Sequence, residues 1–383
     1  MNTDTALFDA RRNYRIAVSS LFFLSGLCFS SWAARIPSIQ HELQLNDAGL
    51  GAVLLSLPVG LMVSLPLAGW LVAKFGSRII VISSAILYAL VLPFIGFAQQ
   101  TWQLMGVLFM FGLSGNLLNI AMNTQGVGVE AIYGRSILAS FHGIWSLAGF
   151  TGAAIGTFMI SQHIAPYHHF LIVSAIALLI VLCAWSFTLA TDANAQVDQP
   201  IFAKPDKSLL NLGIIAFCCM ICEGAMFDWS GVYFQNVVKA KAAWIGAGYT
   251  AFMSTMAAGR FVADWLVTRF GIKRVLQTSG VVIAAGLSVA IIFPDISTSI
   301  AGFVLVGAGV SSVVPLVYSA AGKSKKVSPG VALAAVSTIG YLGFLIGPPV
   351  IGFIAQASSL RISFILIAVL GLTTTLVASK TKW

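Results

Sequence analysis

Long apolar segments alternate with short polar ones along almost the whole chain. Each apolar segment reaches about 20 residues, the length that an α-helix needs to cross the hydrocarbon core of a bilayer. Most of them are bounded by Gly, Pro, Asn or charged residues. The pattern predicts twelve transmembrane helices, at 14–36, 47–72, 79–98, 102–127, 135–161, 168–190, 209–235, 243–267, 275–294, 299–321, 329–356 and 361–379.

One long polar stretch interrupts this pattern, at residues 191–208. It is rich in Asp, Asn and Pro, which favours a loop. We therefore expect an N-terminal six-helix bundle at 1–190, a cytoplasmic central loop at 191–208 and a C-terminal six-helix bundle at 209–383.

The two halves share a register. The basic segments Lys74–Arg78 and Arg269–Arg274 lie 195 residues apart, and the same offset aligns three pairs of glycines. These pairs are Gly51 with Gly246, Gly112 with Gly307, and Gly152 with Gly347. Internal repeats in an apolar chain are typical of transporter folds. We therefore predict an all-α membrane protein of twelve transmembrane helices in two pseudo-symmetric six-helix bundles.

Charge is scarce and unevenly distributed. Only 9% of residues are charged, against about 25% in soluble domains. The net charge of +9 could suggest nucleic acid binding, but twelve alternating spans place 16 of the 21 Lys and Arg on one side. The positive-inside rule makes that side cytoplasmic. We expect a multi-pass protein with both termini in the cytoplasm, no nucleic acid partner, and a first apolar segment that is retained as a helix.

Cofactor and enzyme chemistry find no support in the sequence. All five cysteines fall in predicted spans, and no H-E-x-x-H helix, acyl-transfer motif or nucleotide-binding loop is present. His163, His168 and His169 are predicted to lie in a solvated outer loop, without a metal. We therefore expect no cofactor, no bound metal and no enzymatic activity.

Ionisable residues inside the spans are the main functional candidates, because each costs ~2.5–3.5 kcal/mol at a helix centre. The repeat places Arg35 and Asp228 at similar depths, and we predict that they pair across the two halves as a gate latch. The alternative is that each pairs within its own half or extends toward the membrane surface. Arg260 and Asp264 complete the predicted gating set.

Three residues are candidates for proton coupling: Glu223, Asp228 and His142. Glu223 lies near the middle of its span, where a partly desolvated carboxylate can take up and release a proton. The alternative for Glu223 is a carboxylate held by hydrogen bonds in a packed interface. The alternative for His142 is a hydrogen-bonded packing residue.

A row of amides provides candidate ligand contacts. Asn116, Asn119 and Asn123 share one helix face, which suits a hydroxylated or amide-bearing ligand. Polar contact between helices is the alternative. The full predicted substrate-binding set is Trp32, Asn116, Asn119, Asn123, Trp145, Glu223, Trp229 and Tyr341, of which the aromatic residues could equally be core packing.

These segments resemble the major facilitator superfamily over essentially the whole chain. The loop at Gly69–Arg78 is similar to the family's loop signature, although Ala73 stands where the family usually has Asp. The second copy has Thr268 at that place, with Asp264 four residues earlier.

Within the superfamily, four segments resemble the YbjJ-like inner membrane proteins near the fucose-permease group: Ser31–Pro37, Phe141–Gly143, Glu223–Trp229 and Gly340–Pro349. The resemblance implies a central cavity and alternating access in a bacterial inner membrane. Fucose permeases carry a carboxylate in the first helix, which this chain lacks.

The sequence as a whole favours a monomeric secondary active transporter that moves a small polar solute together with protons, a symport. A proton-driven exporter of amphipathic or drug-like compounds is an alternative. A non-transporting membrane receptor is an alternative of a different class.

Overall fold

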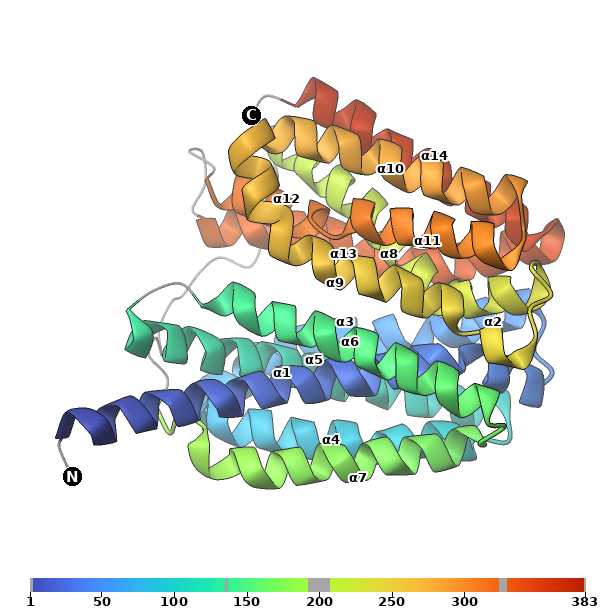
Figure 1. Ribbon diagram of the computed structural model, residues 1–383. Coiled ribbons are helices and arrows are strands. Elements are labelled where there is room, and N and C mark those ends of the chain that lie inside the picture. The colour runs from blue at the N-terminus through green and yellow to red at the C-terminus, as the bar shows by residue number, and fades with distance from the viewer. Residues whose placement is uncertain (1–2, 135–136, 192–206, 324–328, 382–383) are drawn as a thin grey trace. The chain divides into compact units, whose positions relative to one another are not determined.

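The computed structural model describes residues 3–134, 137–191, 207–323 and 329–381, and it is helical throughout this part (Figure 1). Short 3₁₀ turns follow α7 and precede α9, at Trp185–Phe187 and Ala242–Trp244. The α-helices are α1 Thr3–Glu42, α2 Asp47–Leu54, α3 Ser56–Phe75, α4 Ser77–Phe97, α5 Thr101–Tyr133, α6 Leu138–Ser161, α7 Pro166–Ala184, α8 Lys207–Asn236, α9 Ala247–Phe270, α10 Ile272–Ile292, α11 Ile296–Val310, α12 Val313–Gly322, α13 Pro329–Ala357 and α14 Leu360–Lys380.

Two of the predicted spans are each broken into two helices. The span predicted at 47–72 becomes α2 and α3, and the span at 299–321 becomes α11 and α12. Each break lies just before a proline in the following helix. Pro58 has no N–H to donate to the carbonyl of Leu54, and Pro315 has none for Ser311. The helical ladder therefore opens at these points.

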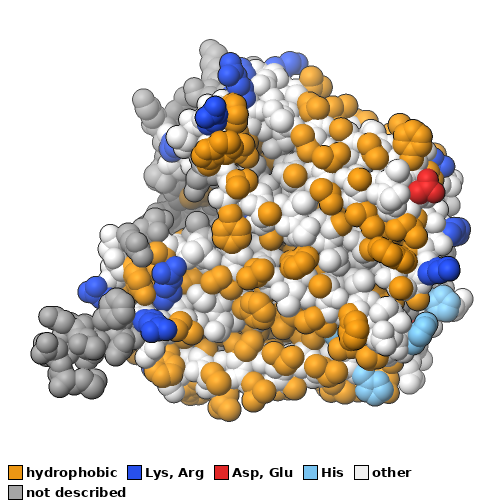
Figure 2. Space-filling model, in the orientation of Figure 1, with side chains coloured by type: hydrophobic (Ala, Val, Ile, Leu, Met, Phe, Trp, Pro, Cys, Tyr) orange, Lys and Arg blue, Asp and Glu red, His pale blue; other side chains and the backbone are white. Residues whose placement is uncertain are grey.

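The surface of the helices suits a lipid environment. Eleven helical segments in the described part are long and apolar enough to cross a membrane. The one predicted span without a counterpart among these segments, 243–267, corresponds to α9, which has 24 residues. Figure 2 shows hydrophobic side chains over most of one face, with Lys and Arg gathered toward the helix ends. The most exposed large apolar side chains include Leu182, Trp102 and Phe261.

The chain divides into two compact units. Unit 1 comprises residues 1–39 and 56–197, and unit 2 comprises residues 40–55 and 198–383. Unit 2 thus includes α2, which packs on α13 where Gly51 meets the backbone of Gly352. The domain boundaries predicted at 190 and 209 stay a prediction, because residues 192–206 lie outside the described part of the chain.

The internal repeat is visible in the packing of each unit. In unit 1, a Cβ added to Gly112 would collide with the carbonyl oxygen of Leu57. In unit 2, a Cβ on Gly307 would collide with the carbonyl oxygen of Phe252, which lies 195 residues after Leu57. The same two helix pairs, α3 with α5 and α9 with α11, therefore approach closely at matching glycines.

The two basic segments have the same local geometry. Trp70 packs edge-on against Phe75 at 6.2 Å, and Trp265 packs edge-on against Phe270 at 6.3 Å. Lys74 lies over the Trp70 ring, and its repeat partner Arg269 lies over the Trp265 ring. The turns that follow use Gly76 and Gly271, with φ of 81° and 78°. The duplication inferred from the sequence thus extends to side-chain contacts.

Candidate functional site

A buried ion pair joins α8 to α9 within unit 2. Nη2 of Arg260 lies 3.5 Å from Oε1 of Glu223, with 20% and 9% of the two side chains exposed. Both charges sit in the middle part of their helices. Such a pair is stable inside a membrane protein only because each charge offsets the desolvation of the other.

Two tyrosines lie close enough to Glu223 to be affected by its charge. Tyr318 on α12 and Tyr341 on α13 both interact electrostatically with Glu223. Cys219 lies one helical turn before Glu223, and its Sγ is 3.9 Å from the carbonyl oxygen of Val310. Four helices of unit 2 therefore bring a carboxylate, a guanidinium and two phenols together. This set can exchange hydrogen bonds with a polar solute and hold a proton.

The remaining acidic candidates of unit 2 lie near this cluster in sequence. Asp228 is half-buried and follows Glu223 by five residues on α8. The side chain of Asp264 lies outside the described part of the chain. The predicted latch between Arg35 and Asp228 would join the two units, and it stays a prediction.

Within unit 1, Arg35 has a partner that the sequence did not suggest. Nε of Arg35 donates a hydrogen bond to Nδ1 of His169 over 3.1 Å. The prediction that His169 lies in a solvated loop is wrong, because its side chain is fully buried in the first turn of α7. His163 and His168 are exposed, as predicted, although His168 lies in the first turn of α7 and not in a loop. α7 begins at Pro166, two residues before the predicted span, and His169 lies on the face of its first turn that is buried within unit 1.

The row of amides on α5 divides into two parts. Nδ2 of Asn116 donates to Oγ of Ser64 on α3 over 2.7 Å, so this amide joins two helices. Nδ2 of Asn123 donates to Oδ1 of Asn119 over 3.0 Å, and both side chains are half-buried. Asn119 and Asn123 are therefore the better placed of the three to meet a ligand.

The aromatic candidates differ in exposure. Trp32 and Trp229 are almost fully buried, and the Nε1 atoms of their indole rings have no hydrogen-bond partner among the described residues. Trp145 is half-buried beside Phe29, with ring centroids 6.2 Å apart. Tyr341 is also half-buried.

His142 is exposed near the start of α6 and lies edge-on to Phe22 at 5.2 Å. The predicted proton sites Glu223 and His142 therefore lie in different units. The structure groups Glu223 with Arg260 and Tyr341 within unit 2, and His142 belongs to unit 1.

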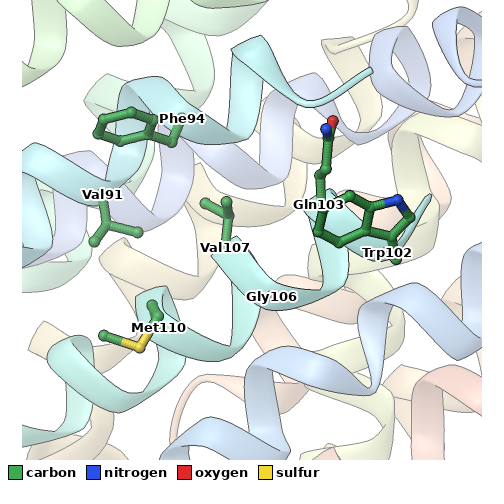
Figure 3. Close-up of a pocket in the computed structure, with 7 residues that line it drawn as sticks. All are labelled: Val91, Phe94, Trp102, Gln103, Gly106, Val107 and Met110. Atoms are coloured by element: carbon green, nitrogen blue, oxygen red, sulfur yellow. The ribbon is translucent and has the colours of Figure 1, made fainter. Parts of the chain in front are cut away.

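A surface hollow of unit 1 offers a contrast to these polar sites. It is lined by Val91 and Phe94 of α4 and by five residues of α5 (Figure 3). The α5 residues are Trp102, Gln103, Gly106, Val107 and Met110. Gln103 is its one polar side chain, and none of the predicted site residues lines it. The hollow suits lipid rather than a polar solute.

Sequence comparison identifies relatives over almost the whole chain. The family model described as the Major Facilitator Superfamily matches residues 18–249 and 239–381. An uncharacterized MFS-type transporter of Yersinia pestis is 33% identical over 359 residues, covering 94% of this chain and 93% of that protein.

Solved structures share the fold at lower sequence identity. The nucleoside transporter NupG superposes with a TM-score of 0.76 at 14% identity, covering 97% of this chain and 100% of its own. The E. coli fucose:proton symporter FucP has a TM-score of 0.65 at 17% identity, covering 96% and 98%. At these identities the likeness establishes the fold.

Proposed function

The chain belongs to the major facilitator superfamily of membrane transporters and is not an enzyme, and from that premise we propose a secondary active transporter of a small polar solute, coupled to protons. The single observation that supports this most strongly is the buried Glu223–Arg260 pair with its two neighbouring tyrosines. A carboxylate kept at mid-membrane can carry a proton, and a guanidinium and phenols can bind polar groups of a solute.

Coupling follows if the proton and the solute favour the same conformation. A ligand can shift a conformational equilibrium only through its different affinities for the two states. Glu223 provides such a difference, because its charge is matched by Arg260 only while the two side chains stay together. We further propose the branch of the YbjJ-like proteins, a monomer, and a bacterial inner membrane with both termini in the cytoplasm.

The test is uptake into proteoliposomes that contain the purified full chain. Radiolabelled uridine and L-fucose are the first probes, since the names of two structural neighbours mention a nucleoside and fucose. An inward proton gradient should drive accumulation of a transported probe above its external concentration, and a proton-conducting ionophore should abolish it. Accumulation that is unchanged by the ionophore would exclude proton coupling.

Direction is tested in the same vesicles. If a dye such as ethidium is moved against its gradient while sugars, nucleosides and amino acids are not, the function is that of an exporter of amphipathic compounds. If a probe raises the melting temperature of the protein but shows no counterflow, the protein is a receptor. Counterflow of any polar solute supports the proposed transport.

A further inference from the structure

The contact between Arg35 and His169 is not used by the site in unit 2. The two residues are 134 positions apart, and their hydrogen bond ties α1 to α7 within unit 1. Arg35 is 2% exposed and His169 is 0% exposed. Burying titratable side chains inside a membrane bundle costs free energy, and this cost points to a function for the pair.

The direction of the hydrogen bond fixes the state of the imidazole ring. An Arg side chain has only N–H donors, so Nδ1 of His169 must offer its lone pair. The ring proton is therefore on Nε2, which has no hydrogen-bond partner among the described residues. A second proton can enter only at Nδ1, where it would face the N–H of Arg35. The proton and the hydrogen bond thus exclude each other.

The helices around His169 bring few charges to this point. On α6, a Cβ added to Gly156 would lie 3.6 Å from Cε1 of His169, and residues 150–161 of α6 contain no titratable side chain. Neither α4 nor α6 nor α7 carries a carboxylate. The remaining titratable groups on the surrounding helices are His142 of α6, Arg78 and Tyr88 of α4, Tyr167, His168 and Cys183 of α7, and, on α1, Cys28, His41, Glu42 and the Asp, Arg and Tyr residues at positions 4–15.

We propose that His169 is a proton-binding site that is filled only when its hydrogen bond to Arg35 is broken. The α1–α7 contact then becomes sensitive to acid. An imidazole that is hydrated and has no cationic neighbour titrates near pH ~6.5, so the opened contact must also admit water to His169. Because opening is linked to the uptake of one proton, the ratio of open to bonded contact rises by up to about tenfold per pH unit below that value. Only the link of this switch to solute movement rests on the proposed function.

The test compares backbone hydrogen–deuterium exchange of the full chain in nanodiscs at about pH 7.5 and about pH 5.5, with labelling times corrected for intrinsic exchange. In the wild type, we expect protection of residues 30–40 and 166–175 to fall about tenfold at the lower pH. In His169→Asn, the amide oxygen can accept the hydrogen bond from Arg35 and cannot be protonated. Its protection should stay within about twofold at the two pH values.

Two further variants complete the test. His168→Asn removes the exposed neighbour and should behave as the wild type does. His169→Gln serves as the second non-titrating variant if the Asn variant does not fold. Equal protection at both pH values in the wild type, or an acid response that survives in His169→Asn or His169→Gln, overturns the proposal. The experiment contains no solute, so its result is independent of the uptake assays.

Discussion

Nη2 of Arg260 lies 3.5 Å from Oε1 of Glu223, and this is the one ion pair formed by the side chains that the structure describes. The two residues come from neighbouring helices of unit 2 and are 37 positions apart. Because both are mostly buried, removing Arg260 leaves the carboxylate of Glu223 without the counter-ion that the structure shows for it. Stability and transport should therefore respond to these positions in different ways.

The first prediction concerns stability. Arg260→Gln should lower the free energy of unfolding by about 3 kcal/mol, because it leaves Glu223 as an unpaired buried carboxylate. The double variant Glu223→Gln with Arg260→Gln should lose less than the sum of the two single variants. Denaturant unfolding in detergent measures these values. Lys273→Gln, on an exposed turn of α10, is the control and should change stability by less than about 0.5 kcal/mol. Strict additivity of the two pair variants would show that the contact contributes nothing.

The second prediction concerns coupling. Glu223→Gln keeps the size and hydrogen-bonding capacity of the side chain but cannot carry a proton. If Glu223 is the coupling site, this variant should lose proton-driven accumulation while it retains exchange of labelled for unlabelled solute. His142→Gln provides a matched comparison in unit 1 and should retain accumulation if Glu223 alone is responsible. Accumulation at the wild-type level in Glu223→Gln would assign coupling to another group.

The third prediction separates two of the amides on α5. Asn116 donates to Ser64 and is buried, so Asn116→Ala should destabilise unit 1 by about 1 kcal/mol or more. Asn123 is half-buried and bonded to Asn119, so Asn123→Ala should affect stability less and raise the KM for a transported solute. Unfolding curves and uptake kinetics of both variants distinguish these roles. A KM effect at Asn116 alone, with Asn123 silent, would reverse the assignment.

The sequence predicted the repeat well because the repeat depends on glycines at positions where no other residue type fits. Close helix approach at Gly112 and Gly307 leaves no space for a side chain, so the spacing survives as a pattern of glycines. The same holds for Gly76 and Gly271, whose turns need a positive φ. Twelve apolar segments likewise follow directly from the length of a membrane span.

The polar contacts could not be predicted in the same way. The sequence assigned Arg260 to the gating set and Glu223 to proton coupling, and it did not predict that these two residues of neighbouring helices form an ion pair. The partner of Arg35 is 134 residues away, and nothing in the local sequence of His169 distinguishes it from its exposed neighbour His168. Partner choice among a few polar groups depends on helix rotation, which hydropathy alone does not fix.

The last prediction concerns the turn between α3 and α4, where two glycines of the same motif should respond in opposite ways. Gly76 has φ 81° and ψ 150°, a region that residues with a side chain avoid. Gly76→Ala should therefore lower the free energy of unfolding by about 1–3 kcal/mol. Gly69 is helical, seven residues earlier, and apart from its chain neighbours and the adjacent backbone of its own helix, no atom lies within 4 Å of the position its Cβ would occupy. Gly69→Ala should be neutral or stabilising by up to about 1 kcal/mol, because alanine favours the helix.

Thermal and denaturant unfolding of both variants in the same detergent provide the comparison, and Gly271→Ala extends it to the second copy of the turn, where φ is 78°. Because the two turns are equivalent, Gly271→Ala should lose about as much stability as Gly76→Ala. A Gly76→Ala protein as stable as Gly69→Ala would mean that the turn can adopt another conformation without loss. A large effect at only one of the two turns would instead mean that the repeats, although alike in geometry, do not contribute equally to stability.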